Sequence, residues 1–362
     1  MSERGAALAY LVGARPNFIK MAPLLAELKR RAPERDHVLI NTGQHYSREM
    51  AAIFVDELGI GPPDYELAVG SGLHGAQTGR ALERIETVLV DLRPAAFVVA
   101  GDVNSTLAGA LAAAKLSIPV AHLEAGLRSF DRTMPEEINR VLTDQVSRWC
   151  LTHSPEAEEN LAREGVGRER VFFVGNTMID TLVRMRPRID RSPVRERLEL
   201  ADRGYLLVTL HRPALVDGPL LADAMAALED VAGAMPVVFP VHPRTRKMLD
   251  GAECPGVILT DPVGYLDFLS LESGAAAVLT DSGGIQEETT YLGVPCFTLR
   301  DNTERPVTIR AGTNTLLGLD PARIREIPAL LEVRSGSARG DGGPELWDGH
   351  AADRVAQVVA DW

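Results

Sequence analysis

The sequence predicts an α/β protein built from two successive parallel sheets, each covered by helices. Short apolar runs of strand type recur along the chain, and most are followed by a polar or Gly-rich turn and an amphipathic helical stretch. This alternation is typical of parallel strands joined by crossover helices. A length of 362 residues with 45% hydrophobic side chains is enough for two domains, each with its own core.

The first series of strand-like runs fills the N-terminal half of the chain. In order, the runs are ALAYLV, HVLIN, AFVVAG, PVAHLEAG and VFFVGN. Residues 185–204 follow, and they form a densely charged stretch with two prolines and no strand-like run, which is typical of a linker with one surface helix. We therefore expect an N-terminal domain of residues 1–186 and a C-terminal domain of residues 187–362.

The second series begins directly after this linker. Its strand-like runs are YLLVTL, PVVFPV, GVILT, AAAVLT and VPCFTL, separated by helical stretches such as LLADAMAALEDVAGA. Residues 335–344 are rich in Gly and Ser and predict a loop, and the closing HAADRVAQVVADW predicts a last helix. The two halves of the chain thus have the same α/β pattern.

Charge and cysteine content exclude several classes of protein. The chain has 38 Lys and Arg against 50 Asp and Glu, a net charge of -12, so its surface does not attract nucleic acid or anionic lipid. No apolar run approaches the roughly 18 residues of a membrane span, and the N-terminal one is too short for a secretion signal, so we expect a cytoplasmic protein. Cys150, Cys254 and Cys296 lie far apart, which argues against a disulfide framework or a zinc site.

Polar residues gather where the predicted strands end. Ligands of open parallel sheets bind beyond the carboxyl ends of the strands, so these positions are the informative ones. In the N-terminal half the strands lead into the segments Gly13–Pro16, Asn41–His45, Gly101–Ser105 and His122–Gly126. In the C-terminal half they lead into His211–Pro213, His242–Arg244 and Asp281–Gly284. We therefore expect one polar edge on each sheet.

The segment Ser282–Gly284 stands between a predicted strand and a predicted helix. Glycines at such a helix start leave backbone N–H groups open to an anion, which favours a phosphate cradle; a plain N-cap with a tight turn is the alternative. Glu287 and Glu288 follow, where carboxylates suit the hydroxyls of a ribose, and Arg305 supplies a cation for phosphate. A nucleoside diphosphate is the ligand that this combination favours.

The N-terminal half offers carboxylates at the corresponding edge. Asp102 and Glu124 follow neighbouring strands, and acids gathered at one site suit proton transfer. Asp102 has two interpretations, a catalytic acid or the N-cap of the next helix. Glu136 and Glu137 begin a predicted helix after Pro135, where compensation of the helix dipole is the structural alternative.

Histidines divide into two groups by their position. His211 and His242 each end a predicted strand beside an Arg or a Pro, which indicates placement at the polar edge. His153 and His350 lack such a pattern, so we interpret them as structural.

Eight segments together resemble the UDP-N-acetylglucosamine 2-epimerase family, non-hydrolysing branch. They are GARPNFIKMAP, GDVNSTLA, HLEAGLRSFDRTMPEEINR, VGNTMIDTL, HRP, PVHPR, LTDSGGIQEE and RDNTERP, in this order. The resemblance implies a glycosyltransferase-B-like fold of two Rossmann-like domains with the active site in the cleft between them. It also implies that the last helix crosses back to the first domain, that the protein is a homodimer, and that it interconverts UDP-GlcNAc and UDP-ManNAc with neither NAD nor a metal.

The resemblance also implies a mechanism and a set of site residues. UDP is eliminated together with the C2 proton to give a 2-acetamidoglucal, and it then adds back with protonation on the other face of C2. The implied catalytic residues are Asp102, Glu124, Glu136 and His211. The implied ligands are Arg15, Ser282, Gly283, Gly284 and Arg305 for the diphosphate, Glu288 for ribose, Phe268 for uracil and Lys20 as a cation that closes the cleft. Gln44, His45 and His242 match the neighbourhood of a second, activating UDP-GlcNAc.

The chain departs from the family pattern at a few positions. Pro213 and Ala214 follow the His-Arg pair where many members have Asn, Val263 stands where some place Gln beside uracil, and Gly70–His74 differs from the effector segment. The alternatives are a hydrolysing epimerase that releases ManNAc and UDP, an epimerase of a modified UDP-HexNAc, and a glycosyltransferase of the same fold. A silent nucleotide-sugar sensor would keep the phosphate segment and lose the carboxylates, all of which are present here.

Overall fold

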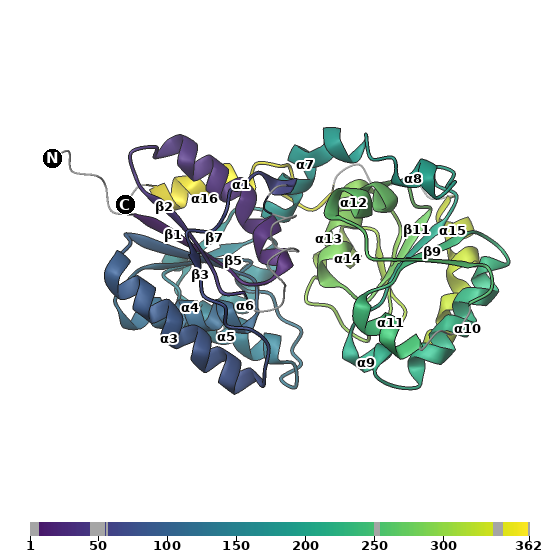
Figure 1. Cartoon of the computed structure of the whole chain (residues 1–362), viewed down its shortest axis with the longest axis horizontal. Coiled ribbons are helices and arrows are strands. Elements are labelled where there is room, and N and C mark those ends of the chain that lie inside the picture. The colour runs from purple at the N-terminus through teal and green to yellow at the C-terminus, as the bar shows by residue number, and fades with distance from the viewer. Residues whose placement is uncertain (1–6, 44–54, 56, 250–253, 336–342, 361–362) are drawn as a thin grey trace. The chain divides into compact units, whose positions relative to one another are not determined.

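The computed structural model describes residues 7–43, 55, 57–249, 254–335 and 343–360. The chain divides into two compact units (Figure 1). Unit 1 comprises Met1–Arg184 together with Glu345–Trp362, and unit 2 comprises Met185–Pro344. Each unit contains one parallel sheet with helices packed on it, which is the α/β architecture that the alternating pattern predicts.

The described part of unit 1 contains a seven-stranded sheet in the order β3-β2-β1-β4-β5-β6-β7, and every pairing is parallel. The strands are β1 (Leu8–Val12), β2 (His37–Asn41), β3 (Tyr65–Glu66), β4 (Ala96–Ala100), β5 (Val120–Leu123), β6 (Trp149–Thr152) and β7 (Val171–Phe173). The helices are α1 (Arg15–Arg31), α3 (His74–Leu92), α4 (Asn104–Lys115), α5 (Pro135–Val146), α6 (Pro155–Arg163), η1 (Arg168–Arg170) and α16 (Ala351–Ala360). Helix α7 (Thr177–Ile189) begins in unit 1 and ends in unit 2.

The central strands of this sheet are apolar because both of their faces are covered. All five residues of β1 and all five of β4 are buried, in runs without polar alternation. Helix α4 is rich in Ala and lies close to the sheet, and a Cβ at Gly109 would overlap the side chain of Leu11. A small-residue helix face therefore sets the distance between α4 and the strands whose ends carry the polar residues.

The described part of unit 2 contains a six-stranded parallel sheet in the order β10-β9-β8-β11-β12-β13. The strands are β8 (Leu206–Thr209), β9 (Val237–Pro240), β10 (Val257–Thr260), β11 (Ala277–Thr280), β12 (Cys296–Thr298) and β13 (Asn314–Leu316). The helices are α8 (Val194–Arg197), α9 (Pro213–Val216), α10 (Leu220–Ala232), α11 (Pro243–Leu249), α12 (Tyr265–Ser273), α13 (Gly283–Leu292), α14 (Val307–Arg310), η2 (Pro321–Glu326) and α15 (Ile327–Ser335).

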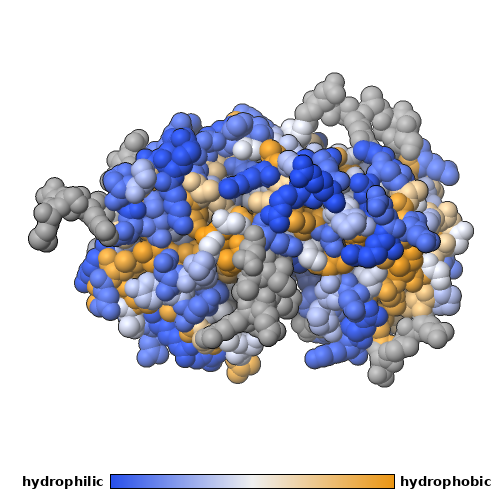
Figure 2. Space-filling view, turned by 45° about the horizontal axis from the view of Figure 1, so that its top comes forward, coloured by the Kyte–Doolittle hydropathy of each residue, from blue (hydrophilic) through white to orange (hydrophobic). Residues whose placement is uncertain are grey.

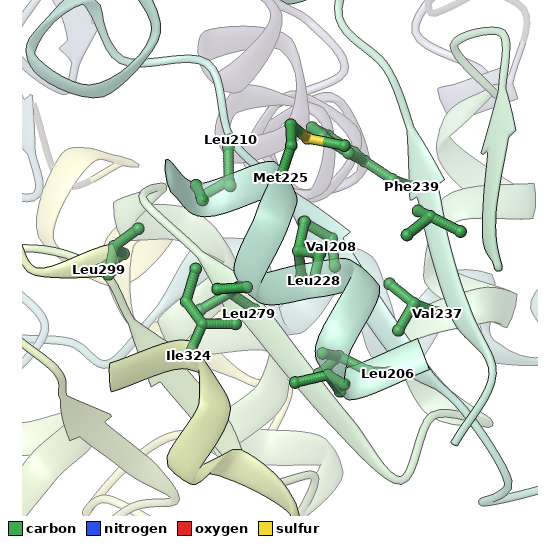
Figure 3. Close-up of a cluster of buried hydrophobic side chains, with 14 of the residues drawn as sticks. Leu206, Val208, Leu210, Met225, Leu228, Val237, Phe239, Leu279, Leu299 and Ile324 are labelled. Carbon is green, nitrogen blue, oxygen red and sulfur yellow. The ribbon is translucent and has the colours of Figure 1, made fainter. Parts of the chain in front are cut away.

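One hydrophobic core cluster of unit 2 lies between α10 and the sheet. Leu228 of α10 meets Val208 and Phe239 of the sheet, and Ile324 of η2 covers one side of the cluster (Figure 3). All four side chains are fully buried, and burial of each contributes roughly 1.5–3 kcal/mol of hydrophobic stabilisation. This packing holds the strands whose carboxyl ends bear His211 and Asp281.

Each sheet has one pair of adjacent strands at which the strand order reverses. From one strand of the pair the chain continues toward one side of the sheet, and from the other strand toward the opposite side. These pairs are β1 with β4 in unit 1 and β8 with β11 in unit 2. Such a switch point leaves a crevice beyond the carboxyl ends of the two strands, which is where ligands of open α/β sheets bind.

Residues 345–362 belong to unit 1. The division of the sequence at residue 186 assigns them to the C-terminal domain, while the family resemblance implies that the last helix crosses back to the first. Helix α16 packs beside α1 (Figure 1), and its Val355 and Val359 are fully buried. Asp180 of α7 accepts hydrogen bonds from the backbone N–H groups of Ala351 and Ala352, at 3.1 and 2.6 Å. An apolar helix face and a capped helix start thus attach the end of the chain to unit 1. Among the described residues, no helix combines the length and hydrophobicity needed to cross a membrane.

The pH dependence of stability tests the contact of Asp180 with α16. Burial raises the pKa of Asp180 to about 6 although two backbone N–H groups lower it. A carboxyl group whose pKa is higher in the folded chain contributes stability that is complete below its unfolded pKa and is lost as the pH rises through the folded value. We expect Asp180→Asn to remove this dependence, which amounts to about 2–3 kcal/mol between roughly pH 4 and pH 7.

The measurement is the free energy of unfolding by urea at both pH values for the parent and the variant. Asp190→Asn is the control, because Asp190 is about half exposed beside Arg186. Its replacement should leave the pH dependence of stability the same as in the parent. Equal pH dependence in Asp180→Asn and the parent would contradict the assignment.

Candidate active site

The polar edge of unit 1 is built around Glu124 and Lys20. Glu124 follows β5, Lys20 lies one turn into α1, and the Lys20 Nζ forms an ion pair with Glu124 Oε2. Both side chains are only 6% exposed. Gly101 lies beside them with a φ of +70°, and a Cβ there would stand 3.2 Å from Lys20 Nζ, so glycine leaves the room that this pair occupies. The arrangement is a buried cation from α1 and a buried carboxylate that follows β5, beside the glycine that follows β4.

Asn17 anchors the start of α1, the helix that bears Lys20, and the sequence analysis did not predict this contact. Its Oδ1 accepts hydrogen bonds from the backbone N–H groups of Gly13 and Ala14, at 3.2 and 2.9 Å. Its Nδ2 donates to the Ala100 carbonyl at 2.8 Å. One amide therefore connects the start of α1 to the end of β4. A polar residue three positions after a predicted helix cap is the sequence signal for such a contact.

Asp102 follows β4 and is paired with Arg140 of α5 through its Oδ2. Its side chain is 29% exposed, which leaves it much more accessible than Glu124. Helix α4 begins at Asn104 with Val103 as its N-cap, so the interpretation of Asp102 as the N-cap is wrong. Asn139 further fixes this loop, because its Nδ2 donates to the Asp102 carbonyl at 2.9 Å.

The two glutamates at the start of α5 have different surroundings. Glu137 is buried and accepts hydrogen bonds from the Ser129 backbone N–H, the Ser129 hydroxyl and the Phe130 backbone N–H, each at 2.9 Å. It also pairs with Arg140. Glu136 is half-buried and forms no hydrogen bond or ion pair within the described ranges. Glu137 is therefore structural, whereas the Glu136 carboxylate is available for a ligand.

The polar edge of unit 2 contains the start of α13 with an arginine held against it. Ser282 is the N-cap residue, but its side chain makes no capping hydrogen bond. A Cβ at Gly283 would overlap the Arg305 guanidinium, so glycine at this position lets the cation lie against the helix start. Glu287 Oε1 accepts from Arg305 Nε at 2.6 Å and holds the guanidinium there. Backbone N–H groups and a fixed cation together suit a phosphate.

This ion pair corrects one expectation for the acidic pair after the phosphate segment. Glu287 is fully buried against Arg305 and does not serve a ribose hydroxyl. Glu288 is 4% exposed, and Tyr265 donates a hydrogen bond from its hydroxyl to Glu288 Oε1 at 3.1 Å. Beside it, burial and the Glu288 charge raise the pKa of Glu272 well above its usual range. Glu288 alone of the pair remains a candidate for binding hydroxyls.

Asp281, which directly precedes the start of α13, fixes the backbone of His211. Its Oδ2 accepts hydrogen bonds from the backbone N–H groups of His211 and Arg212, at 2.8 and 2.7 Å. Its Oδ1 lies 3.1 Å from His211 Nδ1. Asp281 is buried, whereas the His211 side chain is 41% exposed, with its ring centroid 6.0 Å from that of His242. A fixed backbone thus presents one imidazole to solvent beside Ser282.

The remaining predicted residues lie around these two edges. Phe268 of α12 is half-buried and packs with Val263 against a core cluster. A pocket of about 320 Å³ opens next to them, lined mainly by residues 260–264 and Arg197. Arg15 is half-buried at the start of α1. Gln44 and His45 lie outside the described residues. His242 is exposed, two residues after the end of β9.

Two parallel-sheet α/β units with polar carboxyl edges define a glycosyltransferase-B-like protein. A glycosyltransferase of kitacinnamycin, only 15% identical, shares this fold with a TM-score of 0.58 over 99% of both chains. The family model described as UDP-N-acetylglucosamine 2-epimerase matches residues 26–360. The chain belongs to the UDP-N-acetylglucosamine 2-epimerase family.

Individual relatives are similar over nearly the whole chain. A UDP-N-acetylglucosamine 2-epimerase of Methanocaldococcus jannaschii is 41% identical and covers 97% of this chain and 98% of its own length. Its crystal structure in complex with UDP-GlcNAc and UDP has a TM-score of 0.88 and covers 98% of this chain and 100% of that one. A UDP-2,3-diacetamido-2,3-dideoxy-D-glucuronate 2-epimerase of Pseudomonas aeruginosa is also 41% identical, over 97% of this chain and 98% of its own.

Removal of the buried cation tests the pairing of Lys20 with Glu124. We expect Lys20→Met to destabilise unit 1 by about 3–5 kcal/mol, because it takes away the cation beside a buried carboxylate. Lys20→Met combined with Glu124→Gln should recover a large part of this loss, since the buried charge is then gone as well. The free energies of unfolding of the two single variants and the double variant give the coupling between the side chains.

An exposed ion pair of the same unit is the matched control. Arg163 and Glu159 of α6 pair at 3.0 Å with side chains 68% and 63% exposed, so their coupling should be less than about 1 kcal/mol. Equal coupling in the exposed pair and in the Lys20–Glu124 pair would contradict the buried pairing.

Proposed function

We propose that this protein interconverts UDP-GlcNAc and UDP-ManNAc by inverting C2 of the sugar without net hydrolysis. The observation that carries the proposal is the pair of site types within one chain of this family. Unit 1 has carboxylates and a buried lysine at the carboxyl edge of its sheet, and unit 2 has a helix start with a fixed arginine. The first suits proton transfer and the second suits a diphosphate.

Elimination is the mechanism that these residues support best. No carbonyl lies next to C2 of the hexosamine, so direct removal of its proton would leave an unstabilised carbanion. Breaking the C1–O bond while the C2 proton leaves avoids that carbanion, since the electron pair of the C2–H bond becomes the C1–C2 double bond. UDP departs with the electrons of the C1–O bond, and its return with a proton on the other face of C2 gives the epimer.

The acid and base groups of this reaction are proposed to come from unit 1. Asp102 is paired with Arg140 and partly exposed, Glu136 is half-buried at a helix start, and Glu124 is paired with Lys20. Asp102 and Glu136 have the accessible carboxylates and therefore are the residues that we assign to proton transfer at C2. Glu124 and Lys20 form a buried ion pair at the same edge.

The nucleotide is proposed to bind to unit 2. Arg305 and the backbone of Ser282–Gly284 would hold the diphosphate and stabilise it as it departs, and Arg15 of unit 1 would add a second cation. His211, whose backbone N–H is bound by Asp281, would act at the departing phosphate. Glu288 would bind the ribose hydroxyls, and Phe268 would contact uracil.

The proposed reaction uses neither NAD nor a metal, because no step of the elimination or the re-addition transfers a hydride and the leaving group is stabilised by N–H groups and cations. We further propose that the protein works in the cytoplasm as a homodimer. Exposed apolar side chains at and near α5 are candidates for the dimer contact: Phe130 is 72% exposed, Ile138 42% and Leu142 46%. Hydrophobic residues are gathered into patches on the face shown in Figure 2.

A modified UDP-HexNAc is the second candidate substrate. The Pseudomonas aeruginosa relative, whose name states a substrate with acetamido groups at C2 and C3 and a carboxylate, is as similar to this chain as the Methanocaldococcus jannaschii relative is. Elimination at C1 and C2 does not involve the substituents at C3 and C6, so the same residues would perform it.

The reaction itself is tested by proton NMR of UDP-GlcNAc incubated with the protein in D2O and EDTA, without NAD. We expect a mixture of UDP-GlcNAc and UDP-ManNAc with deuterium at C2, because the returning proton comes from groups that exchange with solvent. Free ManNAc and UDP as the main products would establish the hydrolysing reaction instead. Turnover of a C3- or C6-modified analogue but not of UDP-GlcNAc would move the substrate to the modified sugars.

Two kinds of variant separate proton transfer from nucleotide binding. Asp102→Asn and Glu136→Gln keep the shape of the side chain and remove the titrating group, so epimerisation should fall by at least about 10²-fold while UDP affinity stays. Arg305→Ala should weaken UDP binding by roughly 1.5–3 kcal/mol, since a charge-assisted contact is lost.

Calorimetric UDP affinity and deuterium exchange at C2 are measured for each variant. Arg325→Ala is the control for Arg305, because Arg325 is an exposed residue of unit 2 paired with Asp230. Unchanged UDP affinity in Arg305→Ala would refute the diphosphate assignment. Exchange at the parent rate in both carboxylate variants would refute the assignment of proton transfer.

A further inference from the structure

One buried carboxylate of unit 1 lies behind the polar edge and has no role in the reaction described above. Asp144 of α5 is fully buried. Its Oδ1 lies 2.7 Å from His122 Nδ1, and its Oδ2 accepts hydrogen bonds from the Gly126 backbone N–H at 3.1 Å and from Arg128 at 2.7 Å. These contacts attach α5 to the end of β5 and to the loop that follows this strand.

His122 extends this contact to the neighbouring strand. It is fully buried, and its Nε2 lies 2.8 Å from the Gly101 carbonyl. A carbonyl only accepts hydrogen bonds, so Nε2 carries a proton and donates it. Burial alone would raise the pKa of Asp144, but the neighbouring His122 and Arg128 hold it below its usual value. Asp144 is therefore a carboxylate that accepts from its neighbours, His122 Nδ1 included.

The contacts of this cluster lie on both sides of Glu124, whose backbone conformation is unusual. Glu124 has a φ of +68°, in the left-handed region that non-glycine residues rarely adopt. Such a conformation persists only where the surroundings fix it on both sides. The residue two positions before it, His122, and the residue two positions after it, Gly126, both bind Asp144. One carboxylate thus holds both flanks of the strained residue.

The same cluster reaches the loop of Asp102. The Gly101 carbonyl accepts from His122, and the Gly101 N–H donates to the Leu123 carbonyl at 3.1 Å. Gly101 itself has a φ of +70° and directly precedes Asp102. His122 and Asp144 therefore fix the backbone where the segments that bear Glu124 and Asp102 leave the sheet.

We propose that Asp144 and His122 are positioning residues: they set Asp102 for proton transfer at C2, and they set Glu124 for its pairing with Lys20 at the same edge. Neither residue needs to touch the substrate, because each acts through backbone groups next to a carboxylate of the edge. The proposal rests on the proposed epimerisation, since it names what holds the acids of that reaction in place.

The test compares Asp144→Asn and His122→Gln with a matched control, Asp180→Asn. Asp180 is also a buried aspartate of unit 1 that accepts two backbone N–H groups, but it caps α16. The readouts are the dissociation constant of UDP and kcat for UDP-GlcNAc epimerisation with C2 deuterium exchange, both normalised to the number of UDP-binding sites. Normalisation to binding sites removes any loss of folded protein from the comparison.

We expect kcat to fall by at least about tenfold in both variants while the UDP dissociation constant stays within about twofold. The control should keep the kcat of the parent. Parent kcat per binding site in Asp144→Asn and His122→Gln would overturn the positioning role and leave the epimerase function standing. Failure of both variants to fold would also overturn it, in favour of a purely structural role. An inert parent protein would overturn the proposed function, and this assignment with it.

Discussion

Buried carboxylates at the polar edges of the two sheets impose the constraint on which the described structure depends. An ionised carboxyl group removed from water costs several kcal/mol unless donors surround it. Asp144 in unit 1 and Asp281 in unit 2 meet this requirement in the same way, by accepting backbone N–H groups of a loop that follows a neighbouring strand. The donors must stay in place for the fold to be stable, so these loops are fixed before any ligand binds.

Fixed loops of this kind are what a site for elimination requires. Departing diphosphate develops charge, and groups that are already oriented stabilise it without reorganisation. Glu287 holds the Arg305 guanidinium against the start of α13, and Asp281 holds the backbone of His211. In unit 1 the Lys20–Glu124 pair and the Arg140–Asp102 pair orient the acids. A buried partner of opposite charge or a backbone contact thus holds Arg305, His211, Glu124 and Asp102, whereas Glu136 has neither within the described ranges.

The sequence predicts the fold and the polar residues at the strand ends better than it predicts the side chains and backbone groups that hold those residues in place. Apolar strand runs followed by helices predict two parallel sheets, and polar residues after each run predict the edges at which Asp102 and Ser282 lie. Asn17 and the Ala100 carbonyl are 83 positions apart, and His122 and Asp144 are 22 apart. No local periodicity connects such pairs, because the fold brings them together. The pairing of Glu287 with Arg305 was missed for the same reason.

The central claim is that the C1–O bond breaks and re-forms during each inversion of C2. Positional isotope exchange tests it most directly, with UDP-GlcNAc that carries ¹⁸O in the bridge between C1 and the β-phosphate. Free rotation of the β-phosphate of departed UDP should move the label into non-bridging positions at least as fast as UDP-ManNAc accumulates. Formation of UDP-ManNAc with the label still entirely in the bridge would contradict elimination, and with it the roles assigned to the anion site of unit 2.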